Sequence, residues 1–339
     1  MQAIYLVKNG EASSAFELRD HKTPAPQAKE VRIKVEAFGL NYADVMARNG
    51  LYREAPPLPS VIGYEVVGVI DQAGADMADD LIGKRVVAFT RFGGYSQYAI
   101  TKDFAFTVID DLDAGKALSI ATQYVTAYYM ANYVTNFFEG DKVLIHAGAG
   151  GVGTALIQLC KLKGCEVFAT AGSQEKLDYM KSHGADHVIN YRNSDYETEV
   201  QKLLGNERLD ATFNPIAGST FKKDFKLMGS GGRIILFGGS ERSGKKWGIF
   251  STLNFVRKMG LVLPIGTMMR SKSIIGVNML KIGDNRPQVL QRCMNEVAKM
   301  VINGEVNPHV GGRYDVSKIA EAHSFLESRK SIGKVIVTW

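Results

Sequence analysis

The chain shows two different patterns of hydrophobic and polar residues. Over roughly the first 110 residues, short runs of alternating apolar and polar residues are interrupted by glycine and proline, which is typical of β-strands and turns. Beyond that point, short apolar runs alternate with segments of helical periodicity, which indicates βαβ units and a parallel, doubly wound sheet. The pattern therefore predicts an α/β protein with a β-rich part and a parallel sheet covered by helices.

The predicted elements follow from these patterns. Strands are expected at Gln2–Val7, Glu30–Phe38, Glu65–Ala73, Arg85–Thr90, Tyr95–Thr101, Lys142–Ala147, Glu166–Ala171, His187–Asn190, Asp210–Asn214, Arg233–Gly238, Ser273–Met279 and Gly333–Trp339. Helices are expected at Ala117–Tyr133, Gly153–Lys163, Glu175–His183 and Pro287–Asn303. Because the chain returns to β structure at its C-terminus, we expect a β-rich domain of residues 1–121 and 283–339 and a βα domain of residues 122–282.

Composition refines this picture. A length of 339 residues is long for one hydrophobic core and supports two domains. Lys and Arg (41) exceed Asp and Glu (35), but no run of five like charges occurs, so we expect a slightly basic globular enzyme that does not bind nucleic acid. Three cysteines without a C-x-x-C pair suit a reducing compartment. With neither a signal peptide nor a run of about 18 apolar residues, we expect a cytoplasmic protein.

The strongest local motif is a glycine-rich turn between a strand and a helix. It reads Lys142-Val-Leu-Ile-His-Ala-Gly148-Ala-Gly150-Gly151-Val152-Gly153. In this pattern Gly148 allows a tight turn, Gly150 lets the backbone approach a pyrophosphate, and Gly153 lets the helix pack closely on the strand. Gly151 and Val152 lie between them, where the N-terminus of the helix offers N–H groups to phosphates. The motif predicts a dinucleotide site.

The end of the next strand distinguishes between dinucleotides. An NAD site usually carries an acidic residue about 20 positions after the glycines, which binds the ribose 2′-OH. Here the strand ends at Gly172 and continues with Ser173 and Lys176. A hydroxyl and an ammonium favour a 2′-phosphate, whereas a carboxylate would repel it. Glu175 can point to solvent on a helix that begins at Ser173, so we predict NADPH as the cofactor.

Further runs resemble a known family. They are Gly39-Leu-Asn41-Tyr-Ala-Asp44, Arg48-Asn-Gly-Leu-Tyr52, Pro56-Pro-Leu-Pro-Ser-Val-Ile-Gly63-Tyr64-Glu65-Val-Val-Gly68, the glycine turn itself and Gly333-Lys334-Val-Ile-Val. Together they resemble, over essentially the whole chain, the quinone oxidoreductases (zeta-crystallin group) of the medium-chain dehydrogenase/reductase superfamily. Met46-Ala-Arg48, Leu51-Tyr52 and Asn307-Pro-His309 are most similar to the vesicle amine transport protein branch of that group. The resemblance implies a GroES-like β-barrel catalytic domain plus a Rossmann domain.

The resemblance also bears on metal binding and on assembly. Zinc-dependent relatives carry a Cys in the segment of Asn41, a His at the position of Tyr64 and a four-cysteine lobe after the barrel, whereas residues 86–120 here contain no cysteine. A zinc site needs about three or four protein ligands, so we expect no zinc and a structural Glu65 bonded to neighbouring backbone. The family pattern further implies a homodimer joined at the edge of the Rossmann sheet, with Ser273–Met279 as the edge strand.

Without a metal, the expected reaction is hydride transfer from NADPH to a quinone or an α,β-unsaturated carbonyl compound, whose conjugated carbon already accepts hydride. A hydrogen-bond donor near the developing enolate would lower the barrier. By resemblance, Asn41 and Tyr52 line the substrate cleft and Tyr64 stands at a zinc-ligand position, although either tyrosine could serve packing alone. No acidic proton donor stands out, so water is the expected proton source.

Motif matches to the family assign further cofactor contacts. Thr126 matches a residue near the nicotinamide ribose, and Tyr191 matches an aromatic residue at the 2′-phosphate. Phe237, Gly238 and Gly239 match the loop near the nicotinamide, and Asn278 matches a residue that faces the nicotinamide amide. Lys334 matches a basic residue near the pyrophosphate. Asn214 stands where the family usually has an acidic residue, which leaves its ribose contact open. A surface lysine on a terminal strand is the alternative for Lys334.

Two questions stay open at this point. The segment Lys245–Lys272 mixes basic residues with Trp247, Phe250, Phe255, Leu261 and several methionines. Ordinary packing at the cleft and a dimer contact is the interpretation we prefer, with a flexible apolar wall or a lipid-touching patch as hypotheses. For the function, an enoyl-thioester reductase and a nucleotide-binding, lipid-associated adaptor with little turnover are the alternatives to a quinone or enone reductase.

Overall fold

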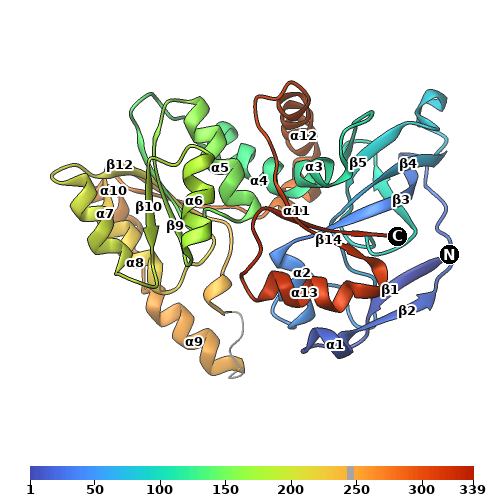
Figure 1. Ribbon diagram of the computed structural model, residues 1–339, viewed down its shortest axis with the longest axis horizontal. Coiled ribbons are helices and arrows are strands. Elements are labelled where there is room, and N and C mark those ends of the chain that lie inside the picture. Colours follow the sequence, from blue (N-terminus) through green and yellow to red (C-terminus); the bar gives the residue numbers. More distant parts are fainter. Residues whose placement is uncertain (243–247) are drawn as a thin grey trace. The chain divides into compact units, whose positions relative to one another are not determined.

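The protein consists of two compact units (Figure 1). The computed structural model describes residues 1–242 and 248–339, the backbone alone for 248–251. Unit 1 comprises Met1–Thr126 and Met279–Trp339, and unit 2 comprises Ala127–Asn278. The domain boundaries expected from the sequence, after residues 121 and 282, fall within the helical stretches Ile120–Tyr124 and Met279–Asn285.

Unit 1 is built on a mostly antiparallel sheet. Among the described residues it has seven strands in the order β14-β15-β3-β4-β5-β7, and β6 also pairs with β3. The strands are β3 (Glu30–Leu40), β4 (Glu65–Ala73), β5 (Arg85–Phe89), β6 (Tyr98–Lys102), β7 (Phe106–Val108), β14 (Val310–Asp315) and β15 (Lys334–Thr338), while β1 (Gln2–Leu6) and β2 (Phe16–Asp20) form a hairpin. The first half of β3 pairs with β6 and its last residues pair with β15, so β3 is the central strand.

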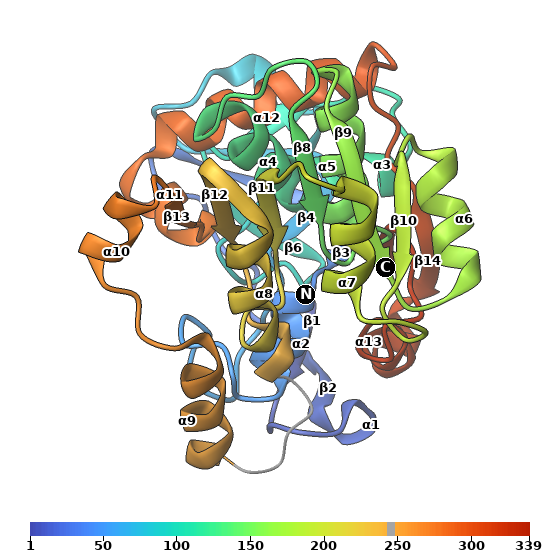
Figure 2. The same ribbon diagram turned by 90° about the vertical axis from the view of Figure 1, so that its left-hand side faces the viewer.

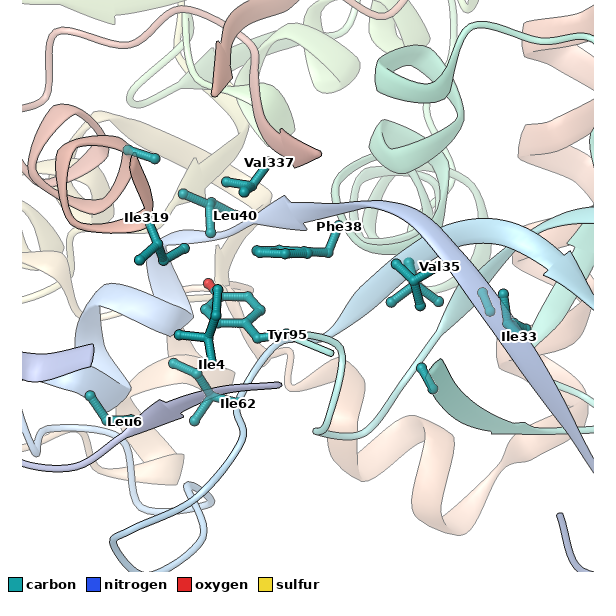
Figure 3. Close-up of a cluster of buried hydrophobic side chains, with 14 of the residues drawn as sticks. Ile4, Leu6, Ile33, Val35, Phe38, Leu40, Ile62, Tyr95, Ile319 and Val337 are labelled. Atoms are coloured by element: carbon teal, nitrogen blue, oxygen red, sulfur yellow. The ribbon is translucent and has the colours of Figure 1, made fainter. Parts of the chain in front are cut away.

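Alternation along β3 creates the core of unit 1. Val31, Ile33 and Val35 are buried, while the intervening charged residues point outward. In Figure 3, Phe38 and Leu40 at the end of β3 lie near the ring of Tyr95, together with Ile4 of β1, Val337 of β15 and Ile319. Ile33 and Val35 lie farther along the strand in the same cluster. The rings of Phe38 and Tyr95 lie with their centroids 4.5 Å apart. The alternating pattern that predicted the strand is therefore the pattern that fills the core.

The helices of unit 1 are mostly short. They are α1 (Ala12–Ala15), α2 (Tyr42–Arg48), α3 (Ala114–Ser119), α11 (Met279–Asn285), α12 (Pro287–Ile302) and α13 (Ile319–Glu327). The predicted helix Ala117–Tyr133 begins earlier, at Ala114, because the Asp113 side chain accepts hydrogen bonds from the N–H groups of Gly115 and Lys116, both 3.0 Å. It also contains π-helical stretches at Ile120–Tyr124 and Tyr129–Tyr133, on either side of α4 (Val125–Tyr128).

Unit 2 contains a parallel sheet, which confirms the predicted doubly wound fold. In the part of the chain that is described, its six strands run in the order β10-β9-β8-β11-β12-β13 (Figure 2). They are β8 (Lys142–Ile145), β9 (Glu166–Ala171), β10 (His187–Asn190), β11 (Leu209–Asn214), β12 (Met228–Leu236) and β13 (Ser273–Gly276). The helices are α5 (Gly151–Leu162), α6 (Gln174–Ser182), α7 (Tyr196–Leu204), α8 (Ser219–Leu227), α9 (Gly248–Met259) and α10 (Pro264–Met269).

Both faces of this parallel sheet are covered. Leu144, Phe168 and Ile189 pack against residues of α7 and α8 in one cluster. Their neighbours Val143 and Val167, which point to the other face, are equally buried. Burial on both faces is what the continuous apolar runs of these strands predict.

Several elements were not predicted, and several bounds were wrong. Helices α7 and α8 were not predicted, because each is only about two turns long and shows few apolar residues at helical spacing. In α7 these are the buried residues Tyr196, Val200 and Leu204. Strand β13 is the expected edge strand but ends at Gly276, and Met279 already belongs to α11. Strand β12 begins earlier than expected, at Met228. Within residues 1–242 and 248–339, no helix combines the length and apolar character needed to cross a bilayer.

A buried ion pair links β4 to β15 across the end of β3. Glu65 and Lys334 are both fully buried, and the ammonium of Lys334 bonds to the carboxylate of Glu65. The Lys334 ammonium also lies 3.4 Å from the Leu40 carbonyl oxygen. Gly39 lies against the pair, and a Cβ atom there would overlap with both side chains. The expectation that Glu65 bonds to backbone is wrong, because Oε1 bonds to the side chains of Lys334 and Asn41, while Oε2 has no partner among the described residues.

We predict that Lys334→Met destabilises unit 1 by about 3–5 kcal/mol, because it leaves the Glu65 carboxylate buried without a counter-charge. The double variant Lys334→Met/Glu65→Gln should regain most of this loss, since no unpaired charge remains. Urea unfolding followed by circular dichroism measures both. Lys330→Met, which changes an exposed lysine nearby in the sequence, is the control. Equal stability of wild type and Lys334→Met would contradict the prediction.

Candidate active site

The ends of the parallel strands define one candidate site, in unit 2. Because all six strands are parallel, their carboxyl ends share one edge of the sheet. From β8 the chain proceeds through β9 to β10 on one side, and then resumes at β11 on the other side of β8. The strand order therefore reverses between β8 and β11, where open α/β sheets bind their ligands.

The glycine turn follows β8 at this edge. A Cβ atom at Gly148 would lie 2.5 Å from the sulfur of Met180, and one at Gly153 would overlap with the Ala147 carbonyl oxygen. Both glycines are therefore required by packing inside the protein. A Cβ atom at Gly150 would meet only that carbonyl oxygen, at 3.3 Å, within the described residues. Gly150 is thus the glycine that the fold itself requires least, which fits a role toward a ligand.

Helix α5 begins two residues earlier than the sequence predicted. Gly150 is its N-cap residue, and the amide of Thr154 donates the first intrahelical bond, to the Gly150 carbonyl oxygen at 2.8 Å. The amides of Gly151, Val152 and Gly153 precede it in the first turn, where a helix leaves its N–H groups without intrahelical acceptors. These amides and the positive end of the helix dipole suit a pyrophosphate.

The ends of β9 and β10 form a basic, hydroxyl-bearing corner beside the glycine turn. A Cβ atom at Gly172 would lie 2.7 Å from the hydroxyl oxygen of Tyr191 and 3.0 Å from Nε of Arg192. A side chain at position 172 would therefore have to displace the outer ends of Tyr191 and Arg192, whereas glycine lets both lie close to the end of β9. Ser173 is the N-cap of α6, and its hydroxyl makes no capping hydrogen bond. Glu175 is exposed, as expected.

Lys176 adds a second positive charge to this corner. Burial lowers the pKa of Lys176, and repulsion from Arg192 lowers it further, while Glu175 opposes both effects. A dianion placed between Lys176 and Arg192 would relieve the repulsion between these two cations. Arg192 was missed by sequence reasoning, although it follows Tyr191 directly in Ile189-Asn-Tyr-Arg192 and a cation at that strand end was the available signal.

The other half of the edge carries the candidates for the nicotinamide side. Asn214 ends β11, and its side chain is fully buried and used inside the protein. Phe237, Gly238 and Gly239 follow β12, and a Cβ atom at Gly238 would lie 2.6 Å from the Pro215 carbonyl oxygen. Asn278 is exposed just beyond β13. The structure thus brings these candidates to one edge of the sheet, while Asn214 faces inward.

Unit 1 holds the catalytic candidates. The side-chain amide of Asn41 donates to Glu65 (2.8 Å), and its oxygen accepts from Lys334 (3.2 Å). A carboxylate needs a donor and an ammonium needs an acceptor, so this network fixes the orientation of the amide. Only the second N–H of Asn41 can donate to a substrate. Lys334 is no surface lysine, and because Glu65 already neutralises it, the structure does not support the expected contact with a pyrophosphate.

Tyr52 and Tyr64 lie edge to face, with ring centroids 6.1 Å apart. The Tyr64 hydroxyl is buried and makes no hydrogen bond to the described residues. Burial raises the pKa of Tyr64 well above its usual range, and Asp44 adds to the effect. Burial, followed by Glu54, raises the pKa of Tyr52 to about 12. Both phenols therefore keep their protons at neutral pH and can act as hydrogen-bond donors.

Asp44 is an acidic residue that sequence reasoning did not single out. One of its oxygens accepts a hydrogen bond from the backbone N–H of Asn41 at 2.8 Å, and the other oxygen has no partner among the described residues. Burial raises the pKa of Asp44 to about 8, although the bond from Asn41 opposes the shift. A carboxyl group that holds a proton near neutral pH has the property of a general acid. Its signal in the sequence was its spacing of three residues from Asn41.

The remaining questions concern Thr126 and metal ligands. Thr126 is half-buried at the end of unit 1, and its hydroxyl donates to the Thr122 carbonyl oxygen at 2.6 Å. Across the described ranges, no three His, Cys, Asp or Glu side chains gather in a way that could hold a metal ion. Position 41, where zinc-dependent relatives carry a cysteine, instead holds the amide that bonds to Glu65 and Lys334.

The segment from α9 through α10 exposes apolar side chains, so packing within the chain does not bury them, and the dimer contact that we expected for this segment stays a prediction. The exposed residues include Leu253, Val256, Leu261, Leu263, Ile265, Met268 and Met269. Lys258 pairs with Glu241, and Lys272 lies over the ring of Phe225. Lys245, Lys246 and Trp247 lie outside the described residues, as does the side chain of Phe250.

Two family models match the chain. The model of the alcohol dehydrogenase GroES-like domain matches residues 27–127, and that of the zinc-binding dehydrogenases matches residues 151–296. A mycobacterial protein solved in complex with NADPH superposes with a TM-score of 0.87 over 100% of both chains, at 27% identity. These matches confirm the GroES-like domain and the Rossmann-type sheet.

Curated relatives point to the same group. The chain is 30% identical to the human quinone oxidoreductase over 341 residues, which covers 99% of this chain and 97% of the relative. It is 30% identical over 318 residues to the synaptic vesicle membrane protein VAT-1 homolog of Danio rerio, covering 93% of this chain but only 65% of that longer protein. The chain therefore belongs to the quinone oxidoreductase group of the medium-chain dehydrogenase/reductase superfamily, a family of nicotinamide-dependent oxidoreductases.

Proposed function

We propose that the protein binds NADPH on unit 2 and reduces quinones or other α,β-unsaturated carbonyl compounds without a metal. The observation that carries this proposal is the basic corner at the ends of β9 and β10. Gly172 stands where an NAD site usually carries its acid, while Ser173, Lys176, Tyr191 and Arg192 suit a 2′-phosphate. The NADPH complex of the mycobacterial relative supports the same cofactor.

The protein's share of the chemistry is binding and orientation. When bound, NADPH would supply the hydride. The amides of Gly151, Val152 and Gly153 would hold the pyrophosphate, and the loop Phe237–Gly239 would border the nicotinamide. In unit 1, the second N–H of Asn41 and the hydroxyls of Tyr52 and Tyr64 would donate hydrogen bonds to the substrate oxygen, where negative charge develops. A conjugated substrate needs no stronger polarisation than this.

The likeness to the human quinone oxidoreductase supports quinones as the substrate class. The exposed apolar face of α9 and α10, together with the likeness to a vesicle protein, keeps the lipid-associated adaptor as a second candidate. We propose that two copies of the chain pair through this face and the free edge of β13. We further propose a small-molecule substrate, a cytoplasmic location and no nucleic-acid partner.

An NADPH-oxidation screen separates these functions. We expect turnover with quinones and enones, weaker turnover with enoyl thioesters, and none with saturated ketones, since only a conjugated carbon accepts hydride without a stronger electrophile. Faster reduction of enoyl thioesters than of quinones would favour the enoyl-thioester reductase. Tight NADPH binding without turnover of any of these substrates would favour the adaptor and overturn the proposed reaction.

The glycine turn gives a direct test of the dinucleotide site. We predict that Gly150→Ala leaves the melting temperature within about 2 °C of wild type but weakens NADPH binding about tenfold or more, because the added methyl group meets little of the protein and stands where the pyrophosphate approaches. Isothermal titration calorimetry measures the affinity. Gly276→Ala, at a position with no neighbouring atom within 4 Å, is the matched control. Unchanged affinity in Gly150→Ala would place the pyrophosphate elsewhere.

The basic corner gives a test of cofactor choice. We predict that Lys176→Gln and Arg192→Gln each weaken NADPH binding about tenfold, while NADH binding stays unchanged, because only NADPH carries the phosphate that these cations contact. Lys181→Gln, on the exposed last turn of α6, should change neither affinity. Titrations with both cofactors provide the measurement. If wild type binds NADH as tightly as NADPH, the assignment of this corner is wrong.

A further inference from the structure

A closed polar cluster lies beneath the carboxyl edge of the parallel sheet, and none of the proposed cofactor contacts explains it. Its centre is the carboxylate of Asp224, on α8, which is fully buried. The carboxylate accepts from Tyr196 (2.8 Å) and from the Asn214 amide (2.6 Å), and its oxygens lie 2.9 and 3.1 Å from Nε2 of His146. A buried carboxylate with three donors is well compensated, so the cluster is organised as a unit.

The hydrogen-bonding capacities fix the roles in this cluster. A carboxylate only accepts, so Nε2 of His146 carries the hydrogen that points to Asp224. In the neutral ring Nδ1 then accepts, and the Thr170 hydroxyl, 3.2 Å away, is its donor. The cluster thereby connects the ends of three neighbouring strands: His146 follows β8, Thr170 lies near the end of β9, and Asn214 ends β11.

Each of these connections leads to one part of the edge. His146 directly precedes the turn Ala147–Gly153, and the Gly148 amide donates to the Thr170 carbonyl oxygen at 3.0 Å. The Asn214 side-chain oxygen accepts from the amides of Ile216 and Ala217, both at 2.8 Å. Those bonds shape the loop after β11, against which Gly238 packs closely. The Asp224 carboxylate therefore fixes the position of the glycine turn relative to the loop after β11.

We propose that Asp224 is a positioning residue for the dinucleotide: without touching the cofactor, its carboxylate sets the spacing between the pyrophosphate turn and the Pro215–Gly239 side of the edge. This inference rests on the proposed dinucleotide site but not on the proposed substrate. Binding energy depends on that spacing because a dinucleotide must contact both sides at once.

Exchanging the two groups that face one another tests the proposal. Asp224→Asn offers a single oxygen to three donors, and we expect it to weaken NADPH binding about tenfold. Asn214→Asp places two carboxylates against each other, and we expect a larger loss of affinity, together with lower stability. The double variant Asn214→Asp/Asp224→Asn restores one carboxylate and one amide to the pair, and we expect affinity within about threefold of wild type.

The measurement is calorimetric titration with NADPH at a temperature where each variant is folded, with the melting temperature recorded separately. Tyr196→Phe, which removes only one donor, provides a milder variant, for which we expect a loss of about threefold. Glu199→Gln, a half-buried carboxylate on α7 that pairs with Lys202 outside the cluster, is the matched control and should bind like wild type.

Two results would overturn the proposal. One is wild-type affinity in folded Asp224→Asn or Tyr196→Phe, which would leave the cluster with a role in stability alone. The other is an exchange variant that is folded but binds as weakly as Asp224→Asn. A failure of the proposed function looks different, because wild type itself would then bind no NADPH or reduce no quinone.

Discussion

The parallel direction of six strands is the constraint on which the rest of unit 2 depends. It brings residues from 148 to 278, which are far apart in the chain, to one edge of a single sheet. The glycine turn, the basic corner and the loops after β11 and β12 can contact one ligand only because they all lie at that edge. Helix α5 then adds its first-turn amides at the point where the strand order reverses. A site for an extended anionic ligand follows from topology before any single side chain is considered.

Features with a strong local signature could be predicted from the sequence. The glycine turn was such a case, since its glycines recur at fixed spacing between a strand and a helix, where a Cβ atom at Gly148 or Gly153 would meet atoms closer than 3 Å. The strands β4, β9 and β10 were predicted to the residue, because alternating or continuous apolar runs define them. The position of β13 at the sheet edge followed from the family resemblance and is confirmed.

Long-range pairings could not be predicted. Lys334 and Glu65 stand 269 positions apart, and nothing local shows that a terminal-strand lysine turns inward to a carboxylate. Asp224 lies on a helix of about two turns that the periodicity did not reveal, so its contact with His146 was invisible as well. Arg192 was adjacent to a residue already selected, but its meaning depends on its closeness to Gly172 in space. In each case the missing information is the pairing of distant elements.

The small residue at position 39 has a consequence for how this protein can change over time. Gly39, Glu65 and Lys334 occupy one space on three adjacent strands, so a side chain at position 39 would require smaller residues at positions 65 and 334. The three positions therefore form a coupled set, in which a side chain added at position 39 alone would be destabilising. Asn41, which is held by the same two charges, would have to adapt to any exchange of Glu65 and Lys334.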